Sequence, residues 1–400
     1  MSKVAVLGFG TVGSGVAEVL MTNGAQLENK AGEAVALKYI LDNRDFPENP
    51  YTPYLIKDFA VIEADAEVNL VAECIGGTGV ALDFVRRSLQ AGKHVVTSNK
   101  ALVAAHGTEL MAIAAEKKVN FLFEASVGGG IPVLRPLTFC LGGNQMQEVC
   151  GILNGTTNFM LTKMFQENAA YDDVLALAQK LGYAEADPTA DVEGIDACRK
   201  ICILAALAFG VHVQENLIYT KGISQISALD VAFANKLGMS VKLLGRTYCT
   251  VEDKIVIYVA PHFIPASVPL STVDDVNNAV MVRGNAVGEV MFYGPGAGKL
   301  PTASAVVGDL LDCALHQTQR RHFDWKAAED GQVVPFEDVE NRWFVRTAAA
   351  EGAAKMVFAG CEIVGTMDGQ LGLVTAPMNK KSLDALAEQG FAILGAIPIL

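Results

Sequence analysis

The first third of the chain alternates short apolar runs with segments of helical periodicity. The apolar runs predict strands at residues 4–7, 34–41, 69–74, 94–97 and 119–124. The helical segments lie at residues 14–21, 80–90 and 109–117. Strands that alternate with helices at this spacing are typical of βαβ units, which form a parallel sheet. The pattern therefore predicts an α/β domain at the start of the chain.

After Gly128-Gly129-Gly130 the pattern changes to longer strands and consecutive helices. Strands are predicted at residues 148–153, 241–250, 254–261 and 279–292, and helices at residues 158–167, 171–181 and 195–209. This order favours an α+β domain, in which helices cover one face of a mixed sheet. A further helix at residues 302–319 follows a glycine-rich stretch, and we expect it to return to the first domain.

The tail from Asn341 onward has a β-α-β-β-α-β pattern of its own. Asp368-Gly369 separates its two central strands and is a strong hairpin signal. We therefore expect a chain of three parts. They are residues 1–130 together with about 295–340, residues 131–294, and residues 341–400.

The composition excludes several classes of protein. Of the 400 residues, 51% are hydrophobic and 19% are charged, which is typical of a folded chain. The formal net charge of −13 argues against nucleic acid and against an anionic membrane surface as partners. The most apolar block, residues 201–210, is too short to span a bilayer. The eight cysteines have no metal-binding or disulfide spacing, so we expect reduced thiols in a cytoplasmic protein.

Gly8, Gly10 and Gly13 form a GxGxxG motif between a predicted strand and a predicted helix. The first glycine permits a tight turn, the second lets the backbone approach a pyrophosphate, and the third lets the helix pack on the strand. This context predicts a Rossmann-type domain that binds a nicotinamide dinucleotide. Asp42, which follows the second strand, would hold the ribose 2′-hydroxyl of NAD. Arg44 would instead pair with the 2′-phosphate of NADP, so the residues leave both cofactors open.

Two lysines are candidates for acid–base chemistry. Lys100 follows a strand of the first domain, so we place it at the sheet edge where the nicotinamide binds. Asp196 and Lys200 are one helical turn apart at the start of an apolar helix. A lysine directed into a core must be paired or must release its proton more easily, which suits a general acid or base. The segment 154–158 would offer helix N-terminal N–H groups to a substrate carboxylate.

These motifs resemble those of the homoserine dehydrogenase family over nearly the whole chain. The resemblance rests on GFGTVGSGV, AGKHVVTSNKAL, EASVGGGIPV, GILNGTTNFM, GYAEADPTADVEGIDACRK and GAGKLPTASAVVGDL, in this order and spacing. It implies reversible reduction of L-aspartate 4-semialdehyde to L-homoserine with NAD(P)H, on the route to threonine and methionine. It also implies a homodimer or a dimer of dimers, and a tail that is a shortened ACT-like regulatory module.

The motifs and the resemblance together imply roles for particular residues. The catalytic lysines would be Lys100 and Lys200. The substrate would contact Tyr183, Glu185, Asp191, Asp196, Gly155 and Thr156. The cofactor would contact Gly8, Gly10, Thr11, Val12, Gly13, Asp42, Arg44, Ser98, Lys100, Gly296 and Gly298. A monovalent cation, usually sodium in the family, would be bound by the Glu124 carboxylate and by the carbonyls of Val127, Gly129 and Ile131.

One position departs from the family pattern. Many relatives have an arginine directly before the aspartate that follows the second strand, whereas this chain has Leu41, so the resemblance does not decide between NAD and NADP. Two rival functions are set against the dehydrogenase. A phosphorylating semialdehyde dehydrogenase would need a nucleophilic cysteine beside a base, but Cys74 and Cys140 lie in apolar runs. A non-catalytic NAD(P)-sensing module would bind the cofactor without turnover.

Overall fold

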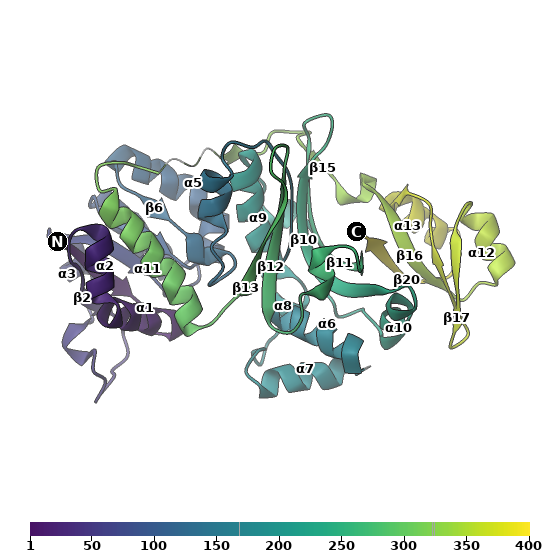
Figure 1. Cartoon of the computed structure of the whole chain (residues 1–400), viewed down its shortest axis with the longest axis horizontal. Helices are drawn as coiled ribbons and strands as arrows, with labels where there is room; N and C mark the ends of the chain where they lie inside the picture. Colours follow the sequence, from purple (N-terminus) through teal and green to yellow (C-terminus); the bar gives the residue numbers. More distant parts are fainter. Residues whose placement is uncertain (168, 322, 324) are drawn as a thin grey trace. The chain divides into compact units, whose positions relative to one another are not determined.

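The computed structural model describes residues 1–167, 169–321, 323 and 325–400 (Figure 1). The chain divides into two compact units, and each unit has a sheet of its own. The first unit consists of Met1–Gly143, Cys202–Glu215 and Gly294–Ala327. The second unit consists of Asn144–Ile201, Asn216–Tyr293 and Ala328–Leu400. The division into three parts that the sequence suggests remains a prediction.

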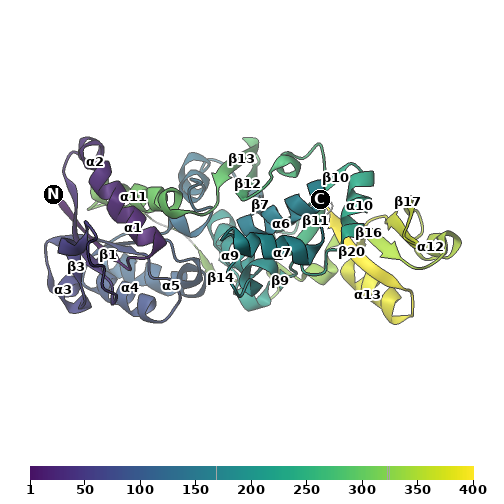
Figure 2. The same cartoon turned by 90° about the horizontal axis from the view of Figure 1, so that it is seen from below.

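The first unit contains a parallel sheet with the strand order of a doubly wound dinucleotide-binding fold. Within the described residues its six strands pair in the order β3 (Leu55–Ile56), β2 (Val35–Leu41), β1 (Ser2–Leu7), β4 (Val68–Glu73), β5 (His94–Thr97) and β6 (Phe121–Leu122). Helices α1 (Thr11–Thr22), α2 (Gly24–Ala31) and α11 (Lys299–Leu315) cover one face, and α3 (Phe59–Ala64), α4 (Val80–Gln90) and α5 (Lys100–Lys117) cover the other (Figure 2). The predicted α/β domain is confirmed.

The packing of this unit fixes the start of α1 beside the sheet. The core between the sheet, α1 and α11 includes Val4, Val6, Leu70, Val16, Leu20, Val306 and Leu310. Because these apolar side chains are buried together, α1 begins directly beyond the carboxyl end of β1. A separate two-stranded ladder joins β8 (Val211–His212) to β14 (Lys326–Ala327).

Two boundaries in the first unit differ from the prediction. α5 begins at Lys100 rather than at residue 109, because the Asn99 side chain caps it by accepting a hydrogen bond from the Leu102 N–H at 3.1 Å. Lys100 is therefore the first residue of a helix. β6 is much shorter than the strand predicted at residues 119–124, since the chain turns at Glu124 into a short 3₁₀ helix.

The second unit is built on a large mixed sheet. Its described strands pair in the order β13 (Gly288–Pro295), β12 (Asn277–Gly284), β7 (Met146–Ile152), β10 (Met239–Cys249), β11 (Ile255–Pro265), β20 (Ile393–Ile399), β16 (Glu340–Thr347), β18 (Gln370–Val374) and β17 (Glu362–Met367). Short strands β9 (Tyr219–Thr220) and β15 (Val333–Val334) pair with β11, and β19 (Met378–Asn379) pairs with β16. The helices of this unit include α6 (Gly155–Glu167), α7 (Tyr171–Lys180), α8 (Thr189–Val192), α10 (Ala228–Lys236), α12 (Glu351–Val357) and α13 (Lys380–Glu388). Helix α9 (Ile195–Phe209) begins in this unit, but its residues from Cys202 onward belong to the first unit.

The long strand predicted at residues 279–292 is wrong. β12 and β13 are separate strands, and a turn joins them. The Asn144 Oδ1 atom accepts hydrogen bonds from the N–H groups of Ala286 and Val287 in that turn, at 3.2 and 2.8 Å. A distant side chain thus stabilises a break that the local apolar pattern does not indicate.

The tail has the predicted order of elements, namely β16, α12, β17, β18, α13 and β20. Asp368 and Gly369 form the predicted hairpin turn, with φ of 47° and 72°. The tail shares the sheet of the second unit, because Ile399 of β20 pairs with Phe263 of β11. Over the described parts of the chain, helices are too short or too polar to cross a membrane.

Candidate active site

The glycine turn after β1 has the geometry of a phosphate-binding turn. Gly8 has a φ of +90°, and a Cβ atom on Gly13 would lie only 1.9 Å from the Gly8 carbonyl oxygen. Gly10, in contrast, faces open space. Gly10 is also the N-cap of α1, which no side chain caps. The N–H groups of Thr11 and Val12 in the first helical turn can therefore serve an anion.

A cavity of about 510 Å³ lies beside this turn. Its lining brings together residues that were predicted for the cofactor and others that were not: Gly8, Gly10, Leu41, Asp42, Asn43, Arg44, Lys57, Cys74, Ile75, Val80 and Phe84. The volume is within the range of cofactor pockets. Open space beside Gly10 and an uncapped helix start are what a pyrophosphate requires, so the residues fit a nicotinamide dinucleotide.

Asp42 is fully engaged by its own neighbours. Its Oδ2 atom accepts a hydrogen bond from the Phe9 N–H at 2.7 Å, and its Oδ1 atom accepts one from the Arg44 N–H at 2.9 Å. The Arg44 guanidinium also binds both carboxylate oxygens, at 3.0 and 2.9 Å. These hydrogen bonds with Arg44 hold the pKa of the Asp42 carboxyl well below its usual range. Asp42 therefore anchors Arg44 at the rim of the cavity.

The loops after β4 and β5 are held together by a residue that the sequence analysis missed. Glu73 is fully buried, and its Oε1 atom accepts hydrogen bonds from the N–H groups of Ile75 and Gly76 at 2.7 and 3.0 Å. Its Oε2 atom accepts one from the Thr97 hydroxyl at 2.6 Å. Ser98 directly follows β5 and is half-buried. A glutamate that ends a buried strand was the available signal for this arrangement.

The second glycine-rich stretch packs beside the first one. A Cβ atom on Gly129 would lie 2.4 Å from the Gly296 carbonyl oxygen, and one on Gly15 would lie 2.7 Å from the Lys299 carbonyl oxygen. Gly298, with a φ of +123°, is the N-cap of α11. The starts of α1 and α11 are therefore close within the first unit, as the predicted cofactor contacts require.

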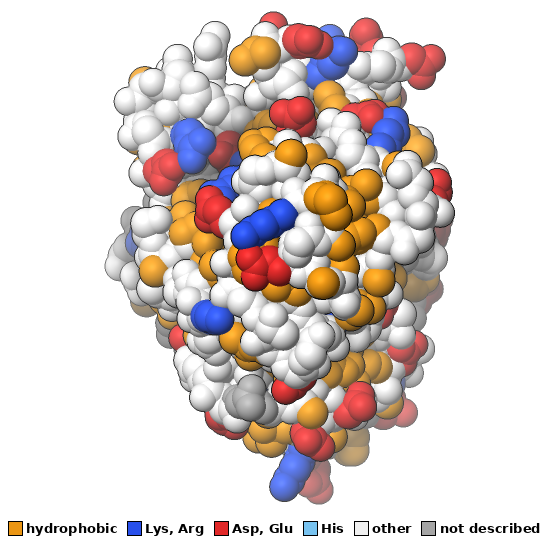
Figure 3. Space-filling view, turned by 90° about the vertical axis from the view of Figure 1, so that its right-hand side faces the viewer, with side chains coloured by type: hydrophobic (Ala, Val, Ile, Leu, Met, Phe, Trp, Pro, Cys, Tyr) orange, Lys and Arg blue, Asp and Glu red, His pale blue; other side chains and the backbone are white. Residues whose placement is uncertain are grey.

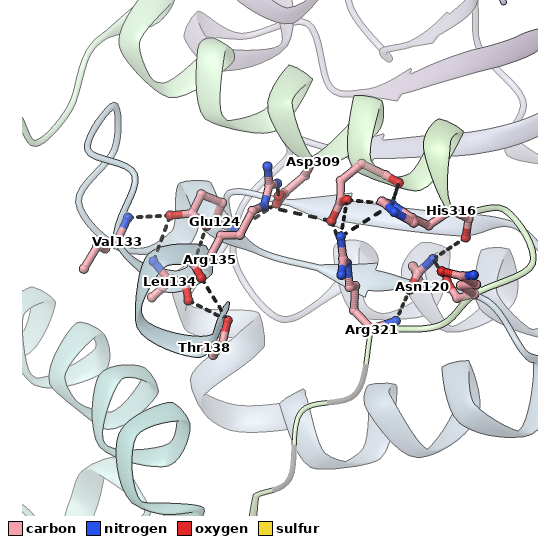
Figure 4. Close-up of polar contacts among 11 residues, drawn as sticks. Asn120, Glu124, Val133, Leu134, Arg135, Thr138, Asp309, His316 and Arg321 are labelled. Atoms are coloured by element: carbon pink, nitrogen blue, oxygen red, sulfur yellow. Dashed lines mark hydrogen bonds and ion pairs between the residues drawn. The ribbon is translucent and has the colours of Figure 1, made fainter. Parts of the chain in front are cut away.

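Glu124 is fixed by three backbone N–H groups (Figure 4). Its Oε1 atom accepts hydrogen bonds from Val133 and Leu134 at 2.6 and 2.8 Å, and its Oε2 atom accepts one from Arg135 at 2.7 Å. The Arg135 guanidinium in turn forms an ion pair with Asp309 of α11 at 2.6 Å. Burial and the negative charge of Glu124 raise the pKa of Asp309 to about 7.

The loop after Glu124 fits a cation. The loop is buried, and Gly128 and Gly129 have positive φ angles of 73° and 54°. Among the described residues, no group donates a hydrogen bond to the carbonyl oxygens of Val127, Gly129 or Ile131. Buried carbonyls without donors, next to a carboxylate, are the oxygen ligands that a hard cation takes. The described residues contain no cluster of three His, Cys, Asp or Glu side chains that could hold a metal.

Lys200 and Asp196 form a buried ion pair in the second unit. The Lys200 Nζ atom lies 2.7 Å from Asp196 Oδ2 and 2.6 Å from the Leu153 carbonyl oxygen. The two side chains are 9% and 7% exposed. The i, i+4 spacing that the sequence indicates thus brings the lysine and the carboxylate together inside the protein. A buried ammonium that is held by a carboxylate and a carbonyl has a fixed position, which suits a general acid.

Asn154 links this pair to a second acid, a contact that the sequence analysis did not foresee. Its Nδ2 atom donates hydrogen bonds to Asp191 Oδ1 at 2.7 Å and to Asp196 Oδ2 at 3.0 Å. Its Oδ1 atom accepts a hydrogen bond from the Thr157 N–H at 2.8 Å, and so it also caps α6. The sequence places this asparagine at the start of a predicted helix but does not show where its amide hydrogens point.

The other predicted substrate residues are not all in one place: most lie at the start of α6, and one lies apart from it. The Thr156 hydroxyl donates a hydrogen bond to the Tyr183 carbonyl oxygen at 2.6 Å, which ties the start of α6 to the acidic loop. Gly155 starts α6, and a Cβ atom there would lie 2.7 Å from the Val276 carbonyl oxygen. Glu185 is exposed, and within the described residues no hydrogen bond or ion pair joins it to this cluster. The structure therefore does not place Glu185 in contact with the Lys200–Asp196 ion pair.

A doubly wound sheet with this glycine turn, in a chain that also carries a buried lysine–carboxylate pair, defines an NAD(P)-dependent oxidoreductase. Residues 8–124 match the family model "Homoserine dehydrogenase, NAD binding domain", and residues 132–311 match the model "Homoserine dehydrogenase". A homoserine dehydrogenase of Pseudomonas aeruginosa is 42% identical over 358 residues, which cover 87% of this chain and 82% of that protein. A homoserine dehydrogenase of Neisseria gonorrhoeae is 38% identical over 397 residues, which cover 97% and 88%. The chain belongs to the homoserine dehydrogenase family.

Solved structures agree with this assignment. The crystal structure of a homoserine dehydrogenase from Thiobacillus denitrificans matches with a TM-score of 0.91 and 37% identity, covering 100% of this chain and 98% of that chain. A hyperthermophilic archaeal homoserine dehydrogenase in complex with NADPH matches with a TM-score of 0.66 and 28% identity, covering 78% and 98%. The resemblance stated from the motifs is therefore confirmed, and so is the NAD(P)-dependent class.

The thiols argue against the rival phosphorylating dehydrogenase. Cys74 lines the cofactor cavity, but burial raises the pKa of its thiol well above the usual range, and the Glu73 carboxylate raises it further. Burial likewise raises the pKa of Cys150 to about 12. A nucleophilic cysteine needs a lowered pKa and a neighbouring base, so neither thiol has the required environment.

Proposed function

We propose that Lys200 is the general acid in the reduction of L-aspartate 4-semialdehyde to L-homoserine. The observation that carries the proposal is the buried Nζ atom held between Asp196 Oδ2 and the Leu153 carbonyl. When bound, the reduced nicotinamide supplies a hydride to the aldehyde carbon. The aldehyde oxygen then gains negative charge. The fixed ammonium group of Lys200 would stabilise this charge and donate a proton to the oxygen. The Asp196 carboxylate would hold the ammonium group in place and balance its positive charge in the apolar surroundings.

Lys100 is proposed as a second positive charge for the same oxygen. It is the first residue of α5, directly beyond the carboxyl end of β5, and the Asn99 cap fixes the start of that helix. Ligands of doubly wound sheets bind beyond the carboxyl ends of the strands, which supports a place for Lys100 at the nicotinamide side. A lysine there would stabilise the developing charge without taking part in proton transfer.

Recognition of the substrate is proposed to use the two ends of the same cluster. Asp191 and Asp196, held side by side by Asn154, would bind the substrate ammonium group. The start of α6 at Gly155 and Thr156 would face the carboxylate, because helix N-terminal N–H groups favour anions. Tyr183 lies against this start and would close one side of the pocket. Glu185 would reach an ammonium group only if the exposed loop that carries it moved.

The cofactor is proposed to be NADP(H) in preference to NAD(H). Asp42 would have to offer a carboxylate oxygen to hold the 2′-hydroxyl of NAD, but both oxygens are already bound by Phe9 and Arg44. Arg44, which is paired with Asp42, and Lys57, which is paired with Asp45, both line the cavity at this end and can donate hydrogen bonds to an anion there. A phosphate group is bound more favourably there than a hydroxyl group.

A monovalent cation, with sodium as the first candidate, is proposed at the loop after Glu124. The ligands would be one carboxylate oxygen of Glu124 and the carbonyls of Val127, Gly129 and Ile131. The cation would fix the loop that contacts Gly296 and would stay outside the chemistry. Its role would therefore be structural.

The assembly is proposed to be a homodimer or a dimer of dimers in the cytoplasm. Apolar side chains gather between charged ones on the face that carries α12 and β17 (Figure 3), where Met356 is 82% exposed. The edge strand β13 also exposes Met291 and Tyr293. Exposed apolar edges of this kind are typical of protein interfaces. The eight free cysteines are in keeping with a reducing compartment.

The proposed reaction is tested by following oxidation of NADPH and NADH with L-aspartate 4-semialdehyde. We expect rapid oxidation that depends on the semialdehyde, and a higher kcat/KM with NADPH. No oxidation with either cofactor, in protein shown to bind NADPH, would contradict the proposal and would favour a cofactor-sensing module. Sedimentation equilibrium in the same buffer tests the assembly, and thermal unfolding with and without sodium ions tests the cation.

A further inference from the structure

A cavity of about 290 Å³ opens within the second unit, in the sheet between β11 and β20. β20 pairs with β16 along most of its length, from Ile393 to Ile399, but its register with β11 consists of the single pair Phe263 and Ile399. α13 lies over the same region (Figure 1). The two strands therefore separate after one contact, and the space between them is closed by side chains of α13 and of the segment after β9.

In the part of the chain that the structure describes, one lysine of this cavity has no side-chain partner. Lys221 is half-buried and lines the cavity, and within the described residues its ammonium group forms no hydrogen bond or ion pair. Burial lowers the pKa of Lys221, and the charge of nearby Lys380 lowers it further. The two acids that act on Lys221 from a distance are already engaged. Asp230 is paired with Arg346 at 2.8 Å, and Asp384 is paired with Lys380 at 2.6 Å.

Three buried lysines elsewhere in this chain, in contrast, have hydrogen-bond acceptors for their ammonium groups. Lys93 donates hydrogen bonds to the carbonyls of Asp65 and Val68 at 2.7 and 2.9 Å. Lys242 donates to Asp274 at 2.9 Å and to a backbone carbonyl, and Lys200 has two acceptors as well. Lys221 is half-buried, so its ammonium group is partly withdrawn from water, and in the described residues it faces the cavity without an acceptor. A cation in this position favours binding of an anion in the cavity.

Part of the cavity wall is apolar, and the rest includes the polar side chains of Gln225, Lys380 and Asp384. Phe336, Trp343 and Leu383 line it, and the Trp343 Nε1–H is already donated to the Met378 carbonyl oxygen at 2.8 Å. Its indole ring therefore offers an apolar surface to the cavity. A volume of about 290 Å³ is at the lower end of the range for ligand pockets. The occupant should combine one anionic group with a short aliphatic body.

We propose that this cavity binds a small aliphatic monocarboxylate, with its carboxylate on Lys221 and its apolar body against Phe336, Trp343 and Leu383. The site is separate from the residues assigned to the reaction and does not depend on the proposed function. Occupancy would join α13 and β20 to β9 and β11 across the gap in the sheet. It would thereby increase the stability of the second unit.

The test uses the full chain and 4-methylpentanoate as the probe, with calorimetric titration and thermal unfolding. We expect saturable binding of 4-methylpentanoate and a rise in Tm. The neutral isostere 4-methylpentanamide should give neither effect, because it lacks the charge that pairs with Lys221. Inorganic phosphate should bind at least about tenfold more weakly, because it lacks the apolar body. Equal binding of the amide or of phosphate would overturn the proposal, as would no binding of 4-methylpentanoate.

The variant Lys221→Gln tests the contribution of the Lys221 charge to binding. We expect it to weaken the binding of 4-methylpentanoate at least about tenfold, since a charge-assisted hydrogen bond is lost. Without the probe, the Tm of this variant should equal or exceed that of the parent chain, because an unpartnered buried charge is removed. Lys381→Gln, a neighbouring exposed lysine paired with Asp338, is the matched control and should bind like the parent. Unchanged binding in Lys221→Gln, or a large fall in its Tm, would contradict the assignment.

Discussion

The ammonium group of Lys200 lies 2.7 Å from a carboxylate oxygen of Asp196, one helical turn away and almost wholly inside the protein. The pair is not isolated, because Asn154 donates to the same Asp196 oxygen at 3.0 Å. A carboxylate that is shared in this way between an amide and an ammonium cannot rotate freely. The lysine is thereby held in a fixed position, which favours a role as general acid.

Arg44 should control the choice of cofactor. Arg44→Ala is expected to lower kcat/KM for NADPH by at least about tenfold and to change the value for NADH much less, because only NADPH carries the 2′-phosphate. Initial rates with both cofactors give the ratio directly. Arg86→Ala, which removes an arginine paired with Glu109 at the surface of the same unit, is the control. An NADPH to NADH ratio that stays the same in Arg44→Ala would contradict the role of this residue.

The glycine turn and a glycine in α11 should respond in opposite ways to alanine. A methyl group on Gly13 would meet the Gly8 carbonyl at 1.9 Å, so Gly13→Ala should lose cofactor binding and cost about 1–3 kcal/mol of unfolding free energy. Gly308, within α11, has no atom in the way, so Gly308→Ala should stabilise the chain by about 0.5–1 kcal/mol. Thermal unfolding and cofactor fluorescence measure both effects. Equal changes in unfolding free energy and in cofactor binding for the two variants would refute this account of the turn.

Stability should fall in acid partly because of His262. This histidine is fully buried in β11, with Nδ1 at 2.9 Å from the Ala260 carbonyl oxygen, and burial lowers its pKa to about 3. The unfolded chain binds a proton below pH of about 6.5, and the folded chain resists it down to the lowered pKa. The free energy of unfolding should therefore decrease as pH falls through this window, by up to about 1.4 kcal/mol per pH unit.

Urea unfolding across the same pH window checks this prediction. His262→Gln should have a shallower dependence on pH, because its side chain cannot take up a proton. His106→Gln, which changes a partly exposed histidine on α5, should keep the slope of the parent chain. If the unfolding free energy of His262→Gln depended on pH as steeply as that of the parent chain, His262 would not be the cause of the dependence.

The lysine pair was predictable because both partners lie on one helix, where the spacing alone fixes their neighbourhood. Asn154 lies 42 residues before Asp196 in the sequence, so no local pattern shows that it bonds to Asp196. Asp42 and Arg44 are a different case, because they are close in the sequence. Two opposite charges two residues apart were interpreted as competitors for the cofactor, whereas they bind each other.

The parallel sheet of the first unit followed from the alternation of strands and helices, but several element boundaries did not. At two of these boundaries a side chain bonds to the backbone and overrides the apolar pattern, as Asn99 does at α5 and Asn144 does between β12 and β13. α10 was missed although Ser227 and Asp230 form a reciprocal capping box at its start. That motif was visible in the sequence and should have predicted the helix.

The role of Lys200 is tested most directly by kcat for Lys200→Arg, with the parent chain and Lys242→Arg measured alongside. Arginine keeps a positive charge beside Asp196 but does not release a proton, so kcat should fall by about 100-fold or more while cofactor binding persists. Lys200→Ala should also lose turnover. Lys242→Arg alters another buried lysine–aspartate pair of the same unit and should keep kcat within about threefold. A folded Lys200→Arg variant with the kcat of the parent chain would contradict the assignment of Lys200 as the acid.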